Sequence, residues 1–264
     1  MFAVSTVFVM PTEESPREHD ELPPLPPLPP PVPPWLPHRR ERAPRRTAKA
    51  PLTRDVIVDT ALALLDREGL HAMTMRRVAQ ELDTGPASLY AHVANLRELE
   101  DLVYDRVAAE ISWQPPDPRR WQEQLEQLLF DAVTVLRRHP GVARFSLGRI
   151  PLGENALAVS DQVMGLLLVA GVPDQYAAWA MDMLGLFVTA AGYEESVQHA
   201  EGQTEENMRD WYAQLGNYLA NLPPSRYPNV VRLAGAMVQG SGDERLRFGI
   251  SLLVTGLAAT IPRR

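Results

Sequence analysis

Side chains suited to bonding phosphate oxygens and base edges gather within residues 74–92. Ser88, Tyr90 and His92 offer hydroxyl and ring N–H groups to phosphates, contacts that set position without reading sequence. Arg76 carries a guanidinium, which can pair bidentately with guanine. These residue types make a nucleic-acid contact chemically possible. The alternatives are a core tyrosine at Tyr90, a capping or surface histidine at His92 and a solvated charge at Arg76.

Helix signals surround these side chains. Thr53 suits the N-cap position of a first helix, a second helix is expected to start after Thr74, and Pro86 suits the first position of a short third helix. Asn95 would cap a fourth helix that runs to about residue 111. A short helix, a tight turn of about three residues and another short helix form the helix-turn-helix pattern.

Longer helical patterns follow the breaker PPDP at 115–118. They are expected at about residues 120–139, 154–170, 173–200, 204–221 and 243–261. His139 falls at the C-terminal end of the first of them, where the helix dipole favours a positive charge. No alternation of strands and helices is present, so the sequence predicts an all-α fold.

The stretch TMRRVAQELDTGPASLYAHVANLREL at 74–99 resembles the N-terminal DNA-binding domain of the tetracycline-repressor (TetR) family. The matching pattern consists of Ala79, Leu82, Ser88-Leu89-Tyr90, His92-Val93, Asn95 and Leu99. The resemblance implies a three-helix DNA-binding domain whose contacts come from Thr74, Arg76, Ala87, Ser88, Tyr90 and His92. Two positions depart from the family: Leu96 replaces a phosphate-binding lysine, and Asp83 replaces a frequent turn glycine.

Charge is spread unevenly along the chain. A net charge of −7, with six basic and eleven acidic residues in 53–111, argues against a nucleic-acid partner. Residues 38–49, however, carry one acidic and six basic side chains: Arg39, Arg40, Arg42, Arg45, Arg46 and Lys49. We expect this basic arm to bind DNA, with Arg45 and Arg46 as contacts. The alternative is a solubilising linker.

The N-terminal residues 1–37 end in the proline-dense PPLPPLPPPVPPW and are predicted to form no core. They would serve as a spacer, as a docking peptide, or as an extension upstream of a later start codon. The apolar first ten residues lack the charged region of a signal peptide, and no span of membrane length is present. Together with the absence of cysteine, this predicts a cytoplasmic protein with an arm at 38–52 and domains at 53–111 and 119–264.

The resemblance extends to the C-terminal region through Trp121-Gln122, the L-G-x-x-P motif at 147–151 and the F-G-x-x-L motif at 248–252. In tetracycline repressors this region binds ligand, and its last helices pair the two subunits. The resemblance therefore implies a homodimer built on Phe248, Gly249, Leu252, Thr255 and Gly256. The residues alone predict an apolar stripe along this last helix. The alternative to a dimer interface is that this stripe packs inside its own subunit.

Tetracycline repressors hold Mg²⁺ with a histidine just before that Leu-Gly loop, but here Ser146 takes its place. Gln162 and Glu194 match a ligand-facing glutamine and an outer glutamate, and one carboxylate makes no selective Mg²⁺ site. No metal and no cofactor are therefore predicted. The rest of the expected effector site is apolar: Leu128, Ala132, Val159, Val163, Met181 and Gly185. These predict a hydrophobic or aromatic effector, unless they are plain core residues.

The function predicted is a homodimeric repressor that a small, largely apolar molecule releases from a palindromic operator in double-stranded DNA. The alternatives are an activator, or a DNA-binding protein without an effector. No enzymatic activity is predicted, because the chain has no nucleophile elbow, no phosphate-cradling glycine loop and no histidine cluster.

Overall fold

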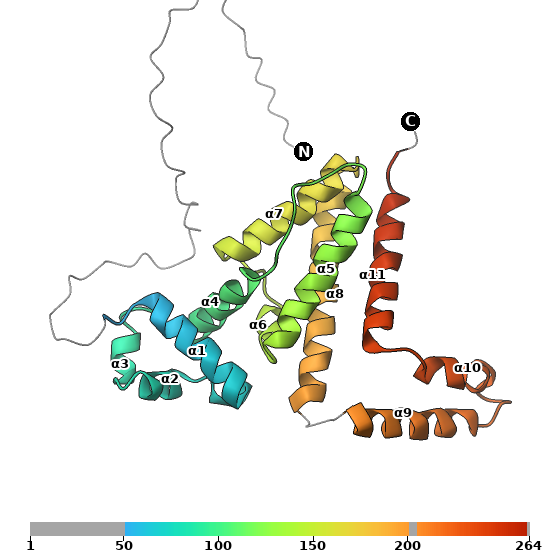
Figure 1. The fold of residues 1–264 in the computed structure, drawn as a ribbon, viewed down its shortest axis with the longest axis horizontal. Coiled ribbons are helices and arrows are strands. Elements are labelled where there is room, and N and C mark those ends of the chain that lie inside the picture. Colours follow the sequence, from blue (N-terminus) through green and yellow to red (C-terminus); the bar gives the residue numbers. More distant parts are fainter. Residues whose placement is uncertain (1–50, 201–204, 263–264) are drawn as a thin grey trace, which may run out of the picture. The chain divides into compact units, whose positions relative to one another are not determined.

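The computed structural model describes residues 51–200 and 205–262, and every regular element in this part of the chain is helical. The N-terminal part of the described chain comprises α1 (Arg54–Glu68), the 3₁₀ helix η1 (Leu70–Ala72), α2 (Met75–Glu81), α3 (Pro86–Leu89) and α4 (Leu96–Ala108) (Figure 1). The predicted all-α class and the helix-turn-helix are confirmed.

Side-chain caps set where these helices begin. The Thr53 hydroxyl accepts a hydrogen bond from Val56 N, and Asn95 Oδ1 accepts one from Glu98 N. Such caps satisfy backbone donors that have no partner inside the helix. In the turn after α2, Asp83 adopts a left-handed conformation with φ of 48°. This is the position where the sequence departs from a frequent glycine, and the aspartate adopts the conformation that glycine would take at lower cost.

The C-terminal region contains seven further helices in the described residues. They are α5 (Trp121–Arg138), α6 (Ala143–Ser146), α7 (Glu154–Val169), α8 (Asp174–Ala200), α9 (Glu205–Ala220), α10 (Pro228–Val238) and α11 (Gly242–Ala258). The five long helices predicted here are present within a few residues of their expected limits. Helices η1, α6 and α10 were not predicted, and α4 ends three residues before its expected end.

One hydrophobic core runs from the helix-turn-helix into the C-terminal helices. Helix α4 lies against α1 on one side and against α5, α6 and α7 on the other. Val103 and Val107 of α4 are fully or almost fully buried in this core. Because α4 belongs to both packing regions, a displacement of the C-terminal helices can move the DNA-binding helices with it.

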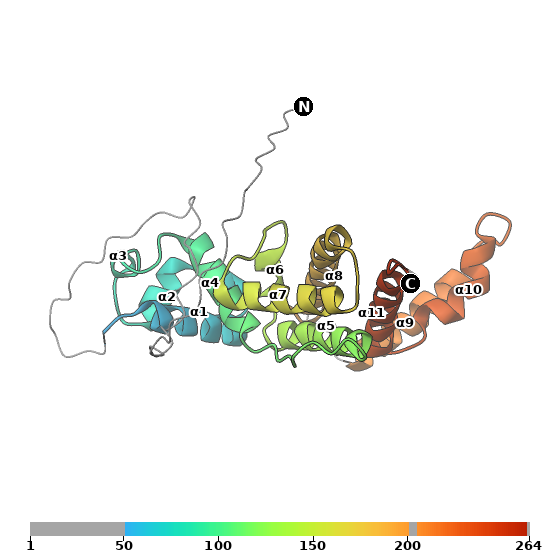
Figure 2. The same ribbon diagram turned by 90° about the horizontal axis from the view of Figure 1, so that it is seen from above.

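Helices α9 and α10 form a hairpin that packs chiefly on itself (Figures 1 and 2). A Cβ atom at Gly216 would lie 3.0 Å from Val238 Cγ2, so the two helices approach closely at this glycine. Ala234 is the one buried residue of α10. None of the described helices has the length and apolar character needed to cross a membrane.

Candidate nucleic-acid interface and effector pocket

The recognition segment, which consists of α3 and the residues up to Val93, turns a polar face outward because its apolar residues are buried in the core. Leu89 and Val93 are fully buried, whereas Ala87 and Ser88 are exposed and Tyr90 is 52% exposed. The structure thus places Tyr90 outside the core, as the DNA-contacting interpretation requires.

The other expected contact residues surround this face. Thr74 is exposed at the start of α2, and its hydroxyl oxygen accepts a bond from Arg77 N at 3.1 Å. Its hydroxyl proton can still be donated to a phosphate. His92 is half-buried, and its carbonyl accepts from Arg54 Nε at 3.4 Å. Arg45 and Arg46 lie outside the described residues.

Ion pairs neutralise most of the arginines in this region. Arg54 lies 2.9 Å from Glu98, and Arg106 lies 2.7 Å from Asp55 and 2.6 Å from Asp59. Four of the six arginines in 53–111 have carboxylate partners: Arg54, Arg67, Arg77 and Arg106. The two others, Arg76 and Arg97, are exposed and have no carboxylate partner among the described residues. They are the cations of 53–111 whose charge is free to face phosphate.

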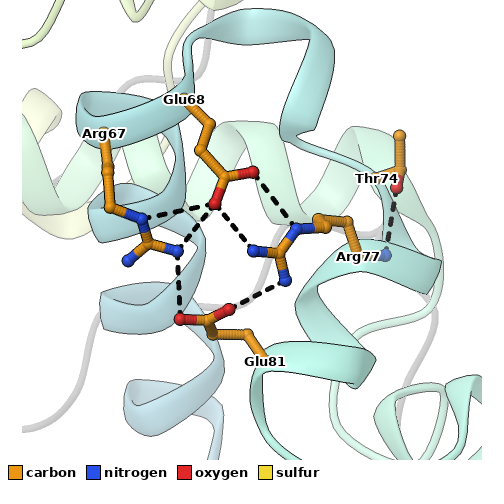
Figure 3. A network of polar contacts seen from close by, with 5 residues as sticks. All are labelled: Arg67, Glu68, Thr74, Arg77 and Glu81. Atoms are coloured by element: carbon orange, nitrogen blue, oxygen red, sulfur yellow. Dashed lines mark hydrogen bonds and ion pairs between the residues drawn. The ribbon is translucent and has the colours of Figure 1, made fainter.

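The end of α1 is bonded to α2 by four alternating charges (Figure 3). Arg77 lies 2.7 Å from Glu68 and 2.8 Å from Glu81, and Arg67 lies 2.8 Å from Glu68 and 3.0 Å from Glu81. Hydrogen bonds from Arg77, then from Arg67, lower the pKa of Glu68 from an ordinary value of 4.5 to about 2. The network fixes α2, which carries Arg76, relative to α1.

The network should make the stability of this region depend on pH. A carboxyl whose pKa is lowered on folding stabilises the protein above its unfolded value, and that stability is lost as pH falls from 4.5 toward about 2. We expect Glu68→Gln to lower stability at neutral pH and to flatten its loss over that interval. Urea unfolding at several acidic pH values measures this. Identical pH profiles for the variant and the wild type would contradict it.

Leu96, at the position of the family's phosphate-binding lysine, is half-buried against the core. The start of α4 is instead held by Glu98, whose carboxylate accepts from Ala94 N and pairs with Arg54. Leu96 therefore contributes packing at this helix end, while Arg97 beside it remains exposed.

An apolar surface runs along the outer sides of α8 and α11. Phe248 is 70% exposed and Leu252 is 62% exposed, and Thr255 and Gly256 are exposed beside them. On α8 the large exposed side chains include Trp179, Met183 and Leu186. An uncovered apolar surface of this kind marks a protein interface.

Gly249 makes a close contact within its own subunit. A Cβ atom at this position would lie 2.9 Å from Phe187 Cζ of the same chain. The glycine therefore allows α11 to approach α8 within the subunit. At Gly256 a Cβ would meet nothing within 4 Å, which leaves this position open toward a second subunit.

A hollow of about 230 Å³ lies between α5, α7 and the segment that follows α4. Its apolar lining consists of Trp113, Leu128 and Leu166, and the remaining lining residues are polar: Ser112, Gln114, Arg120, Glu123, Gln124, Gln127, Asp131 and Gln162. Gln162 Nε2 donates to Gln114 O at 2.7 Å, and Gln124 Nε2 donates to Pro115 O at 2.9 Å. These two glutamines tie the 112–118 segment to the helices.

Two of the nine expected effector residues, Leu128 and Gln162, line this hollow. Ala132 and Val163 are buried in the adjoining core, and Val159 and Met181 are half-buried against it. Gly185 and Glu194 lie on α8, and the Glu194 residue is exposed. The hollow is more polar than the sequence suggested, because polar side chains of α5 and, from the segment after α4, Ser112 and Gln114 line it and were not singled out.

Ser146 belongs to a buried hydroxyl cluster. Its Oγ donates to Ala143 O at 3.0 Å and lies 3.1 Å from Thr189 Oγ1, a contact in which either hydroxyl can donate. Burial raises the pKa of Tyr104, whose hydroxyl bonds to Ser146 and Thr189. No group of histidines and carboxylates able to hold a metal ion occurs in the described residues. The Ser146 hydroxyl therefore contacts Tyr104 of α4 and Thr189 of α8.

Comparison with known proteins connects these two regions. Residues 57–99 match the family model described as bacterial regulatory proteins, tetR family, and residues 114–261 match the tetracyclin repressor-like C-terminal domain. The chain belongs to the TetR family. The regulator is thus a ligand-responsive, DNA-binding transcriptional repressor that forms homodimers.

Relatives of the regulator match along most of its length. The HTH-type transcriptional repressor DrrR1 of Streptomyces coeruleorubidus is 31% identical over 84% of this chain and 83% of its own. The tetracycline repressor protein class E of Escherichia coli is 25% identical over 81% of this chain and 95% of its own. The structure of ActR from Streptomyces coelicolor with actinorhodin is 41% identical, covers 81% of this chain and 99% of its own, and has a TM-score of 0.75.

Trp113, Gln114 and Arg97 were not predicted as site residues. Trp113 and Gln114 lie just before a proline-rich breaker, where a loop signal hid their part in the hollow. Arg97 stands among acidic residues, and its free charge becomes evident only once the partners of the other arginines are known.

Proposed function

We propose that the regulator binds a palindromic operator with the outward face of α3 and the start of α2 from each subunit. The observation that carries this proposal is the contrast between buried Leu89 and Val93 and the exposed polar residues beside them. In this arrangement Ser88, Tyr90, His92 and Thr74 bond phosphates, and Ala87 packs against a base edge.

Arg76 and Arg97, the two arginines without a carboxylate partner, make different contacts with DNA. Arg76 reads a base, because its guanidinium projects from the first turn of α2 and has no carboxylate to hold it. Arg97 neutralises a phosphate at the start of α4, beside the position where Leu96 has replaced a cation. Arg54, Arg67, Arg77 and Arg106 contribute to the fold through their carboxylates and add little attraction for DNA.

Operator titration in rising salt distinguishes these roles. Arg97→Gln should lower the slope of log affinity against log salt by about 0.9 for each phosphate that is no longer neutralised, equally on specific and random duplexes. Arg76→Ala should mainly reduce discrimination, by about 1–3 kcal/mol for each base pair misread. Arg106→Gln is the matched control, because it removes the charge of an arginine that is already paired with Asp55 and Asp59. An equal fall in slope for Arg97→Gln and Arg106→Gln would disprove the division.

The effector that fits the hollow is a planar, oxygenated aromatic molecule. Trp113 is 42% exposed and offers an indole surface for stacking, and the side chains of Gln114 and Gln127 both donate and accept hydrogen bonds. The solved relative ActR binds actinorhodin. A volume of about 230 Å³ is below the ~300–1,000 Å³ of most ligand sites, so binding must widen the hollow toward Ala132 and Val163.

Widening the hollow would move α7, which is bonded directly to α4. Asp105 of α4 accepts from Ala156 N at 2.9 Å and from Asn155 Nδ2 at 3.0 Å. Arg149, in the segment before α7, lies 2.6 Å from Glu100 and 2.9 Å from Asp101. A shift of α7 therefore pulls on α4 and changes the separation of the two recognition helices, which releases the operator.

Release of a fluorescent operator duplex tests the effector class. Actinorhodin with a chelator present should release the wild type, and Trp113→Ala should raise the required concentration about tenfold. Trp113→Phe, which keeps an aromatic ring, should respond nearly as the wild type does. Tetracycline should not release the protein with or without Mg²⁺. Release by tetracycline only when Mg²⁺ is added would contradict the proposed effector class.

We further propose that the regulator acts in the cytoplasm and catalyses no reaction. Its family consists of transcription regulators, and two of the polar side chains lining the hollow, Gln162 and Gln124, hold the 112–118 segment. Turnover of a bound effector, followed by chromatography, would contradict this.

A further inference from the structure

A histidine at the end of α5 lies between two carboxylates from the DNA-binding region. His139 Nδ1 is 2.9 Å from Asp66 Oδ1 and 3.0 Å from Asp66 Oδ2, and its Nε2 is 2.9 Å from Glu110 Oε1. Asp66 belongs to the last part of α1, and Glu110 follows α4. The His139 side chain is 12% exposed, so these contacts are largely shielded from water.

Both contacts are satisfied together only by the imidazolium form. An ionised carboxylate only accepts hydrogen bonds, and a neutral imidazole donates from one nitrogen alone. The neutral ring therefore leaves one carboxylate facing a nitrogen lone pair. The charged groups around the ring are Asp66 from α1, Glu110 from the end of α4, and Arg138 of α5 itself, which lies 3.9 Å from Glu110. The C-terminal end of α5 adds a negative helix dipole.

The backbone beside His139 approaches the DNA-binding region as well. Gly141 has φ of 99°, and a Cβ atom there would lie 3.5 Å from Leu70 Cβ in η1. The turn after α5 therefore contacts the turn after α1. Asp66, Leu70 and Glu110 are thus all held by one short segment of the effector-binding region.

We propose that His139 is a positioning residue that holds the helix-turn-helix in its operator-binding orientation, and that protonation of its ring tightens this hold. The inference rests on the proposed function, in which two recognition helices must meet the operator at a fixed separation. A helix-turn-helix that rocks about α4 spends less time in the binding orientation. The apparent operator affinity then falls in proportion to the fraction of molecules in that orientation. Bonds from His139 to both α1 and the end of α4 restrict this rocking.

The test is the pH dependence of operator affinity in the wild type and in His139→Gln. The probe is a duplex of about 30 base pairs from upstream of the regulator's own gene, titrated by anisotropy at about pH 6 and about pH 8. The ratio of Kd in the variant to Kd in the wild type should be about fivefold or more larger at the lower pH. His92, on the proposed DNA-contacting face, is present in both proteins, so any contribution from it cancels in the ratio.

Two further variants and one DNA-free measurement complete the test. Asp66→Asn should likewise lose the pH-dependent advantage, and His71→Gln, an exposed histidine of η1, should retain it. Urea unfolding should show the wild type gaining stability over His139→Gln as pH falls. If that gain is found while the Kd ratio stays constant with pH, His139 is merely structural and the positioning role is wrong. If neither quantity varies with pH, the protonated contact itself is wrong. Failure of the wild type to bind the duplex at either pH would instead overturn the proposed function.

Discussion

Leu252→Glu is expected to convert the dimer to monomers and to weaken operator binding by about a thousandfold. Leu252 is 62% exposed within one subunit and lies beside Phe248, which is 70% exposed. A two-fold interface contains each substitution twice. The loss of two central side chains, one from each subunit, at about 2 kcal/mol each weakens dimerisation by about a thousandfold. Burying the two new carboxylates adds a further cost.

Light scattering and operator anisotropy at matched concentrations measure these two effects. Leu168→Glu on α7 places the same charge on another exposed leucine and should leave both the mass and the affinity unchanged. Gly256→Glu should resemble Leu252→Glu, because the position is open within the subunit. Gly249 is a poor choice for the experiment, since a side chain there would collide with Phe187 and disturb the fold itself. A Leu252→Glu dimer with full operator affinity would show that another surface joins the subunits.

Deleting residues 1–49 is expected to weaken binding to operator and random DNA alike, by about a hundredfold or more at moderate salt. Within 53–111, two of the six arginines have no carboxylate partner, so the helix-turn-helix supplies few free charges. The arm carries six basic side chains. If about two to four of them neutralise phosphates in each subunit, the salt slope should fall by about 0.9 for each of these phosphates.

A shorter deletion is the control for the arm. Removing residues 1–37 takes away the proline-rich segment and leaves every basic residue of 38–49, so affinity and salt slope should stay as in the full chain. The arm would be irrelevant to DNA binding if removal of 1–49 changed neither quantity. Equal effects of the two deletions would assign the contribution to the proline-rich segment instead.

Local signals were sufficient to predict most helices of this fold. Thr53, Thr74 and Asn95 cap the helices whose starts they predicted, because a cap depends on residues three positions apart. Helix α6 was missed because four residues give no periodicity. Helix α10 was missed because Pro228 and the glycines near its end indicated a loop, although proline suits a first helical turn.

The candidate site was predictable only where it depends on neighbours in sequence. The outward face of α3 follows from the spacing of Leu89 and Val93. The ion pairs that remove four arginines from DNA binding join helices far apart in the chain, such as Arg106 with Asp55. His139 was expected at a helix end, and its helix does end there, but the two carboxylates that bind it lie 73 and 29 residues away. Such partners depend on tertiary packing, which periodicity does not encode.

The most direct test of the account is a competition between two duplexes of about 30 base pairs, one from upstream of the regulator's own gene and one with that sequence scrambled. The account predicts that one dimer binds the upstream duplex about a thousandfold or more tightly than the scrambled one at physiological salt, and that actinorhodin abolishes the difference. Equal affinity for the two duplexes, or a preference that actinorhodin and other oxygenated aromatic molecules leave unchanged, would contradict it.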